Sequence, residues 1–120
     1  MANPNLLTLS TVEAKLATAS LGTSSANILQ NNTSGMTFKV NTITVANTDG
    51  VNSSDVTIGI NDGSNTKYIA YQVTIPPKAT VVISSRETSY YLNQNYSLVA
   101  QRASSPTGTS DIIVSYEEIS

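Results

Sequence analysis

The chain contains no histidine, no cysteine and no tryptophan among its 120 residues. Without cysteine, neither a disulfide framework nor a thiolate metal site can form. Without histidine, the chain lacks the usual general base, proton shuttle and nitrogen ligand for metals. We therefore expect a protein that binds or assembles, that is not an enzyme and that needs no cofactor.

Charged residues are also scarce, at 12% of the chain, and the net charge is −2. The basic residues form no stripe, so we expect no nucleic-acid partner. They are Lys15, Lys39, Lys67, Lys78, Arg86 and Arg102. The first ten residues lack a charged start and a long apolar run, and no segment approaches the length of a membrane span. We therefore expect neither a signal peptide nor a membrane partner.

Alternation of apolar and polar residues is the strongest pattern that is present. Val56, Ile58 and Ile60 alternate with polar or small residues, which is typical of a half-buried strand. Turn sequences rich in Asn, Asp and Gly, at residues 47–50 and 61–65, divide such segments. About eight short strands with turns roughly every 8–12 residues indicate an all-β fold. We predict an antiparallel β-sandwich of the jelly-roll or immunoglobulin-like type.

In the strand expected around residues 38–45, the alternation of apolar and polar residues changes phase. Phe38 and Val40 share one parity, whereas Ile43 and Val45 have the other. A change of phase within a run of β-formers predicts a bulge near residues 41–42, or a strand that bends between two sheets. The predicted core, taken from the alternating segments, consists of Val56, Ile58, Ile69, Tyr71, Val73, Ile83, Leu98, Ile112 and Val114.

Residues 1–35 are patterned more loosely than residues 36–120, which form the predicted sandwich of a single-domain chain. The segment Thr8–Ser20 fits either a short helix capped by Thr11 or one or two strands, and its alternation favours strands. Residues 1–35 are therefore either the first hairpin of the sandwich or an arm that docks on a neighbouring subunit.

The acidic residues show no clear catalytic or metal-binding pattern. The loop at residues 61–65 superficially resembles an oxygen-ligand loop, but it lacks the alternating acids and closing Glu of a calcium-binding hand. Turn chemistry is therefore favoured over calcium binding. Glu117 and Glu118 are neighbours, and neighbours in a strand point to opposite faces. Folding could still bring Asp55 and Asp111 together, as a glycosidase would require.

Tyrosine is the main aromatic residue, and alternation places Tyr71, Tyr96 and Tyr116 in the core. Tyr68 and one of Tyr90 and Tyr91 are then expected to point outward. Exposed tyrosines can anchor a protein interface, stack on sugars or belong to ordinary surface. Together with the apolar residues of the N-terminal segment, they give the candidate interface, which consists of Leu6, Leu7, Leu9, Val12, Leu16, Tyr68 and Tyr90.

Several segments resemble a group of small virion proteins of tailed phages, especially phages of marine bacteria and cyanobacteria. These segments are 1–5, 45–52, 55–57, 75–84, 91–92 and 114–119, with the sequences MANPN, VANTDGVN, DVT, IPPKATVVIS, YL and VSYEEI. The resemblance covers most of the chain and is weakest over residues 14–35. It implies a structural role in the virion, which is assembled in the host cytoplasm, and it brings no enzymatic site.

Our first functional hypothesis from this resemblance is a capsid decoration, or cement, protein that stabilises the head shell. Its partner would be the major capsid protein, and it would act as a homo-oligomer, with a trimer favoured. The alternative within the structural class is a tail, neck or baseplate component that binds a tail or baseplate protein. The alternative of another class is a carbohydrate-binding module that uses surface tyrosines for host adsorption.

Overall fold

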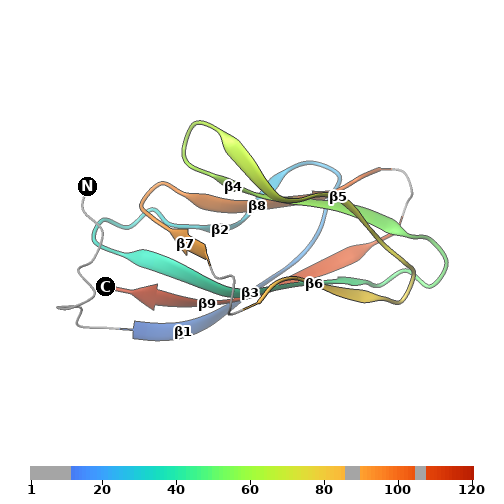
Figure 1. The fold of residues 1–120 in the computed structure, drawn as a ribbon, viewed down its shortest axis with the longest axis horizontal. Coiled ribbons are helices and arrows are strands. Elements are labelled where there is room, and N and C mark those ends of the chain that lie inside the picture. The colour runs from blue at the N-terminus through green and yellow to red at the C-terminus, as the bar shows by residue number, and fades with distance from the viewer. Residues whose placement is uncertain (1–11, 86–89, 105–107) are drawn as a thin grey trace.

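A computed structural model of the chain describes residues 12–85, 90–104 and 108–120. These residues form nine strands in two antiparallel sheets that stack as a sandwich (Figure 1). The strands are β1 (Val12–Ser20), β2 (Ala26–Gln30), β3 (Thr37–Asn47), β4 (Ser54–Asn61), β5 (Thr66–Ile75), β6 (Thr80–Ser84), β7 (Tyr90–Leu92), β8 (Ser97–Arg102) and β9 (Ser110–Ile119). The predicted all-β sandwich is therefore confirmed.

The strand order shows how the chain is wound. Sheet A has the order β1-β9-β3-β6, with β7 also on β3, and sheet B has the order β2-β8-β4-β5. The pairs are nested, because β4 pairs with β5, β3 with β6 and β7, β2 with β8, and β1 with β9. This nesting is the winding of a jelly roll, whereas the immunoglobulin fold places its first two strands in one sheet.

Strands β6 and β7 occupy one edge position of sheet A. Strand β6 pairs with β3 between Ile43 and Ala46, and β7 pairs with β3 between Phe38 and Val40. Both lie on the side of β3 that faces away from β9. The nine strands therefore fill eight positions, which is the strand number of a jelly roll.

Strand β3 contains the predicted bulge. Its pairing with β9 shifts between Val40 and Thr42, so that Asn41 is the extra residue. The bulge reverses the alternation, and the buried residues change from Phe38 and Val40 to Ile43 and Val45. Both halves of β3 therefore point their apolar side chains toward sheet B, and the sequence-based prediction of a bulge is confirmed.

The core lies between the sheets and contains most of the predicted residues. Five of them are fully buried, namely Val56, Ile58, Leu98, Ile112 and Val114. Three are partly buried and pack against this cluster, namely Ile69, Val73 and Ile83. The prediction for Tyr71 is wrong, because its side chain is 63% exposed on the outer face of sheet B.

A second bulge explains the exposure of Tyr71. Val56 pairs with Val73 and Ile58 with Ala70, so Tyr71 and Gln72 together lie opposite Thr57. Gln72 has a φ of 51°, and its backbone N–H donates to the Thr57 hydroxyl oxygen over 3.0 Å. Because two residues oppose one, the alternation of β5 reverses at this point and Tyr71 turns outward.

The N-terminal third of the chain contributes one strand to each sheet. From the sequence, this segment was expected to be either an arm or a first hairpin. Strand β1 pairs with β9 along its whole length, and β2 pairs with β8. The two strands therefore lie in different sheets. Residues 1–11, which include the apolar Leu6, Leu7 and Leu9, lie outside the described residues.

Two buried asparagines connect the crossovers at the ends of the sandwich. The Asn31 side-chain amide donates to the carbonyl oxygens of Met36 and Leu92 over 2.8 and 2.9 Å. The Asn47 amide donates to the carbonyl oxygens of Asn52 and Ile75 over 3.0 and 2.9 Å. Buried carbonyl groups that lack a strand partner need such donors, so these two side chains take the place of sheet pairing where the chain changes sheets.

The burial of Ile58 gives a direct test of the strand phase. Ile58→Ala should lower the free energy of unfolding by about 2–5 kcal/mol, because it leaves a cavity between the sheets. Ile113 is 44% exposed on the opposite sheet and gives a matched control. Ile113→Ala should cost only about 1 kcal/mol or less. Urea unfolding of both variants measures the difference, and equal losses would contradict the described phase.

The role of Asn31 can be tested against its neighbour. Asn31→Ala should cost about 2–4 kcal/mol of unfolding free energy, because the buried Leu92 carbonyl oxygen loses its donor. Asn32 is exposed, so Asn32→Ala should change stability by no more than about 0.5 kcal/mol. Thermal and denaturant unfolding should show this contrast. A stable Asn31→Ala protein would mean that the crossovers do not depend on this amide.

Candidate functional site

The outer face of sheet A exposes five large apolar side chains among the described residues. Val12 and Leu16 of β1 are 50% and 64% exposed, and Ile113 of β9 is 44% exposed. Val82 of β6 and Tyr91 of β7 are 61% and 49% exposed. Large exposed apolar groups on one face are the usual mark of an interaction surface. We call the outward side chains of β1, β9, β3, β6 and β7 the sheet A face.

The pairing register aligns these side chains into uncharged rows. One row consists of Thr18, Ile113, Thr44 and Val82, and the next consists of Leu16, Ser115 and Thr42. The charged outward residues lie in the rows beyond, with Lys39 and Glu117 toward one end and Asp111 toward the other. The centre of the sheet A face is therefore apolar and hydroxyl-rich across the four strands.

The sequence places these residues outward by a simple rule. Successive side chains in a strand point to opposite faces, so a run of three apolar residues whose ends point inward directs its middle residue to the outer face. This happens in the runs 81–83, 90–92 and 112–114, whose middle residues are Val82, Tyr91 and Ile113. In each run the flanking residues point toward the core, and the middle residue belongs to the sheet A face.

The predicted interface residues are divided between the two sheets. Val12 and Leu16 lie together on the sheet A face, whereas Tyr68 lies on the outer face of sheet B. Tyr90 is partly buried and packs against the core, and its neighbour Tyr91 is the outward residue. The sequence interpretation missed Val82 and Ile113, although their apolar runs carried the signal.

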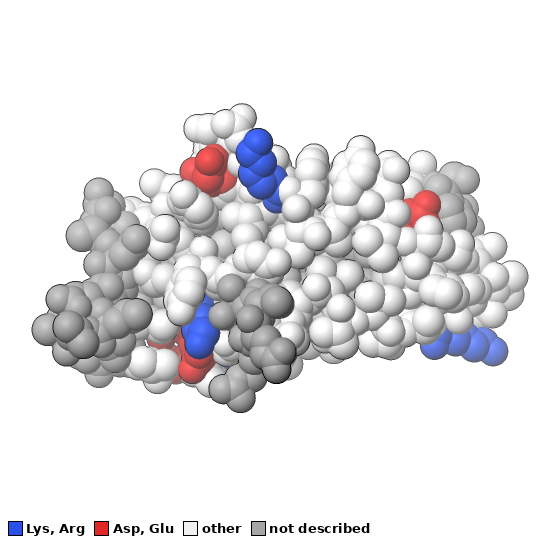
Figure 2. Space-filling view, viewed as in Figure 1, with Lys and Arg blue, Asp and Glu red and all other residues white. Residues whose placement is uncertain are grey.

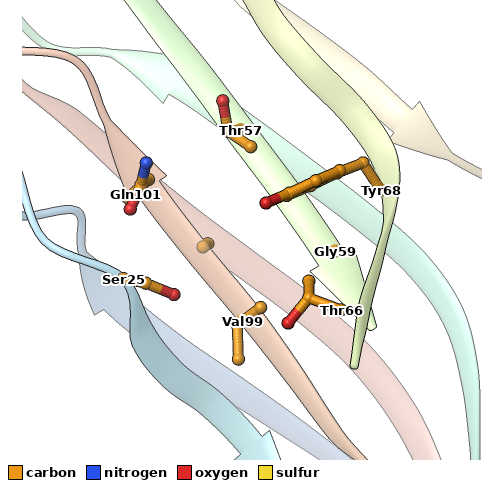
Figure 3. A pocket seen from close by; sticks show the side chains of 8 residues that line it. Ser25, Thr57, Gly59, Thr66, Tyr68, Val99 and Gln101 are labelled. Atoms are coloured by element: carbon orange, nitrogen blue, oxygen red, sulfur yellow. The ribbon is translucent and has the colours of Figure 1, made fainter. Parts of the chain in front are cut away.

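Sheet B has a different outer face, with a groove of about 200 Å³. Thr57 and Gly59 of β4 and Val99 and Gln101 of β8 line it, and Ser25 lies at the side where β2 begins. Figure 3 shows the Tyr68 ring extending from β5 across β4, with its hydroxyl directed toward β8. The groove is therefore walled by an aromatic ring and lined by hydroxyl and amide groups.

Gly59 permits this position of the ring. A Cβ atom at Gly59 would lie 2.8 Å from the carbonyl oxygen of Lys67 and 3.1 Å from the Tyr68 ring. Any larger residue would push β5 and its aromatic ring away from β4. Tyr68 also meets Tyr71 in an edge-on contact, with ring centroids 5.1 Å apart. The two exposed rings therefore form one aromatic cluster beside the groove.

The turn aspartates bond to their own loops. The Asp62 carboxylate accepts the backbone N–H groups of Asn65 and Ser64, and these bonds lower the pKa of Asp62 from its ordinary value. The backbone N–H groups of Asn52 and Val51 lower the pKa of Asp49 in the same way. This confirms the predicted turn chemistry. In the described part of the chain, no group of three or more acidic residues could hold a metal ion.

The two pairs of carboxylates that the sequence singled out, Asp55 with Asp111 and Glu117 with Glu118, do not point into a common site. The Ser54 and Ser110 hydroxyls meet between the sheets at 2.7 Å, so the next residues, Asp55 and Asp111, point to opposite outer faces. Glu118 pairs with Lys15 at 3.0 Å, and Glu117 accepts from the Asn41 amide. The geometry brings neither pair of carboxylates into one site.

Charge is sparse over the side of the molecule shown in Figure 2, where Lys, Arg, Asp and Glu form only a few small groups. Within the described ranges, no helix has the length and apolar character needed to cross a membrane. Comparison with family models and with curated proteins finds no match to this chain. What is established for this chain is therefore its fold, a two-sheet β-sandwich.

Proposed function

We propose that this chain is a structural protein of a phage virion, and specifically a capsid decoration protein that binds the outside of the head shell. The sheet A face is the observation that supports this function best. Its centre is an uncharged, apolar and hydroxyl-rich surface, with charged residues only in the rows beyond, and such a surface binds another protein by packing more than by charge. The sequence resemblance to small virion proteins supports a structural role in the particle, and the partner in this proposal is the major capsid protein.

The dimensions of the sheet A face suit a protein contact. Strands about 4.8 Å apart, with a rise of about 3.4 Å per residue, give four strands a face roughly 15 Å by 34 Å between Cα atoms. With the side chains at its margins, this area approaches the ~800 Å² that each partner contributes to a standard interface. One such contact is of modest strength, but repetition over a symmetric shell multiplies its stabilising effect.

The mechanism is mechanical. A decoration protein that contacts neighbouring shell subunits adds buried interface, which must be broken before those subunits can separate. This resists the outward pressure of packaged DNA. The jelly roll suits this role, because its core is closed between two sheets and its outer faces are available for contacts.

The proposed assembly state is a homo-oligomer, with a trimer favoured. Strand β1 is an edge strand of nine residues, and on its outer side no described strand pairs with it. Unpaired edges of this length promote association between chains. Light scattering should give a mass of three times the 12.7 kDa of one chain, and a mass of one chain at micromolar concentration would contradict the oligomer.

The contact surface can be tested with a matched pair of variants. Val82→Asp places a charge in an uncharged row of the sheet A face, on its edge strand β6, and Val82 is already 61% exposed, so the fold should tolerate it. Burying an unpaired charge in the interface should weaken binding to expanded, DNA-free head shells at least about 30-fold. Co-sedimentation of purified protein with such shells measures this loss.

Val51→Asp is the control, because Val51 is 83% exposed in the loop between β3 and β4 and lies off the sheet A face. It should bind the shells as the unaltered protein does. Equal binding by both variants would contradict the proposed contact surface. If the protein binds isolated tails and not shells, the same surface would instead be the contact of a tail, neck or baseplate component.

A further inference from the structure

The groove on sheet B has no part in the proposed shell contact, because it lies on the opposite outer face of the sandwich. Three strands and the start of β2 build it, and Gly59 is required for the close approach of β5. The groove holds about 200 Å³, which is less than the ~300–1,000 Å³ typical of drug-sized ligands. A ligand of one small ring fits this space.

The aromatic wall favours a ligand with an apolar face. Tyr68 is 57% exposed, and Tyr71 holds its ring by the edge-on contact. Such a ring offers a flat apolar surface that carries partial negative charge, and C–H groups of a ligand can pack against it. A pyranose ring has a suitable face, since its axial C–H bonds project on one side.

The floor and the opposite wall offer hydrogen bonds without charge. The Thr57 hydroxyl oxygen accepts the Gln72 N–H, which leaves its own proton to be donated to a ligand. The Gln101 amide forms no side-chain hydrogen bond within the described part of the chain, and it offers two donors and an acceptor. The Ser25 hydroxyl faces the groove from the β2 side (Figure 3).

The lining residues select against charged ligands. None of them is Lys, Arg, Asp or Glu, so a phosphate or carboxylate would be desolvated in the groove without a counter-charge. The combination of an aromatic face with uncharged hydroxyl and amide groups matches a neutral sugar. We propose that the groove is a subsite for one neutral pyranose unit of a polysaccharide, packed on Tyr68 and hydrogen-bonded by Thr57 and Gln101.

This proposal does not depend on the role of sheet A. A particle protein whose sheet A face contacts the shell would turn the groove of sheet B outward, where it could meet polysaccharide on a cell surface. A single subsite binds weakly, with a dissociation constant on the order of 1 mM. Many copies on one particle would add up to useful avidity.

The test uses nuclear magnetic resonance of the full chain with labelled tyrosine and glutamine side chains. The probes are cellotetraose, mannotetraose and a galactose tetramer, each raised to about 20 mM, which would nearly saturate a millimolar site. At least one probe should shift the ring signals of Tyr68 and the amide signals of Gln101, while Tyr91 on the sheet A face stays unchanged. No shift at Tyr68 with any of the three probes would overturn the proposal.

Variants establish that the shift reports binding in the groove. Tyr68→Ala should weaken binding at least about tenfold, and Tyr91→Ala, which removes an exposed ring on the other sheet, should leave it unchanged. Because Tyr68 covers Gly59, Gln101→Leu is a second variant that leaves the ring in place, and it should also weaken binding severalfold. Unaltered affinity in Gln101→Leu, or stronger shifts with the nucleoside adenosine than with the sugars, would contradict a pyranose subsite.

Discussion

The fold depends on satisfying the backbone where the chain passes from one sheet to the other. Nested pairing makes the chain change sheets at every connection except β4–β5 and β6–β7. Each change leaves carbonyl and N–H groups that no strand can pair, and leaving them buried and unbonded is costly. Asn31 and Asn47 bond several such groups through one side chain each. With both ends of the sandwich closed in this way, the two outer faces are left for contacts.

These outer faces differ because the apolar runs and the bulges fall on different strands. On sheet A, runs of three apolar residues expose Val82, Tyr91 and Ile113 beside Leu16. On sheet B, the bulge in β5 turns Tyr71 outward beside Tyr68, above a groove lined by hydroxyl and amide groups. The proposed shell contact and the proposed sugar subsite therefore lie on opposite faces of the sandwich.

Sequence patterns predicted the features that depend on neighbouring residues. They did not predict the features that depend on contacts between residues far apart in the chain. The bulge of β3 was predicted because its two halves have opposite apolar parity, which is visible in the chain itself. The bulge of β5 was not, because residues 69–75 alternate without a break and the Thr57 hydroxyl on another strand holds the extra residue. The pairing of β1 with β9 spans the chain and left no local signal, so the place of the N-terminal segment stayed open. The groove could not be predicted either, since it needs β4, β5 and β8 side by side.

The most direct test of the central claim is an electron cryomicroscopy map of the intact phage particle. We predict density for this jelly roll on the outside of the head, with the sheet A face against the shell and the groove of sheet B turned toward solvent. Leu16, Val82 and Ile113 would then lie in the contact. A map that places sheet B against the shell, or that shows the sheet A face open to solvent in every copy, would contradict it.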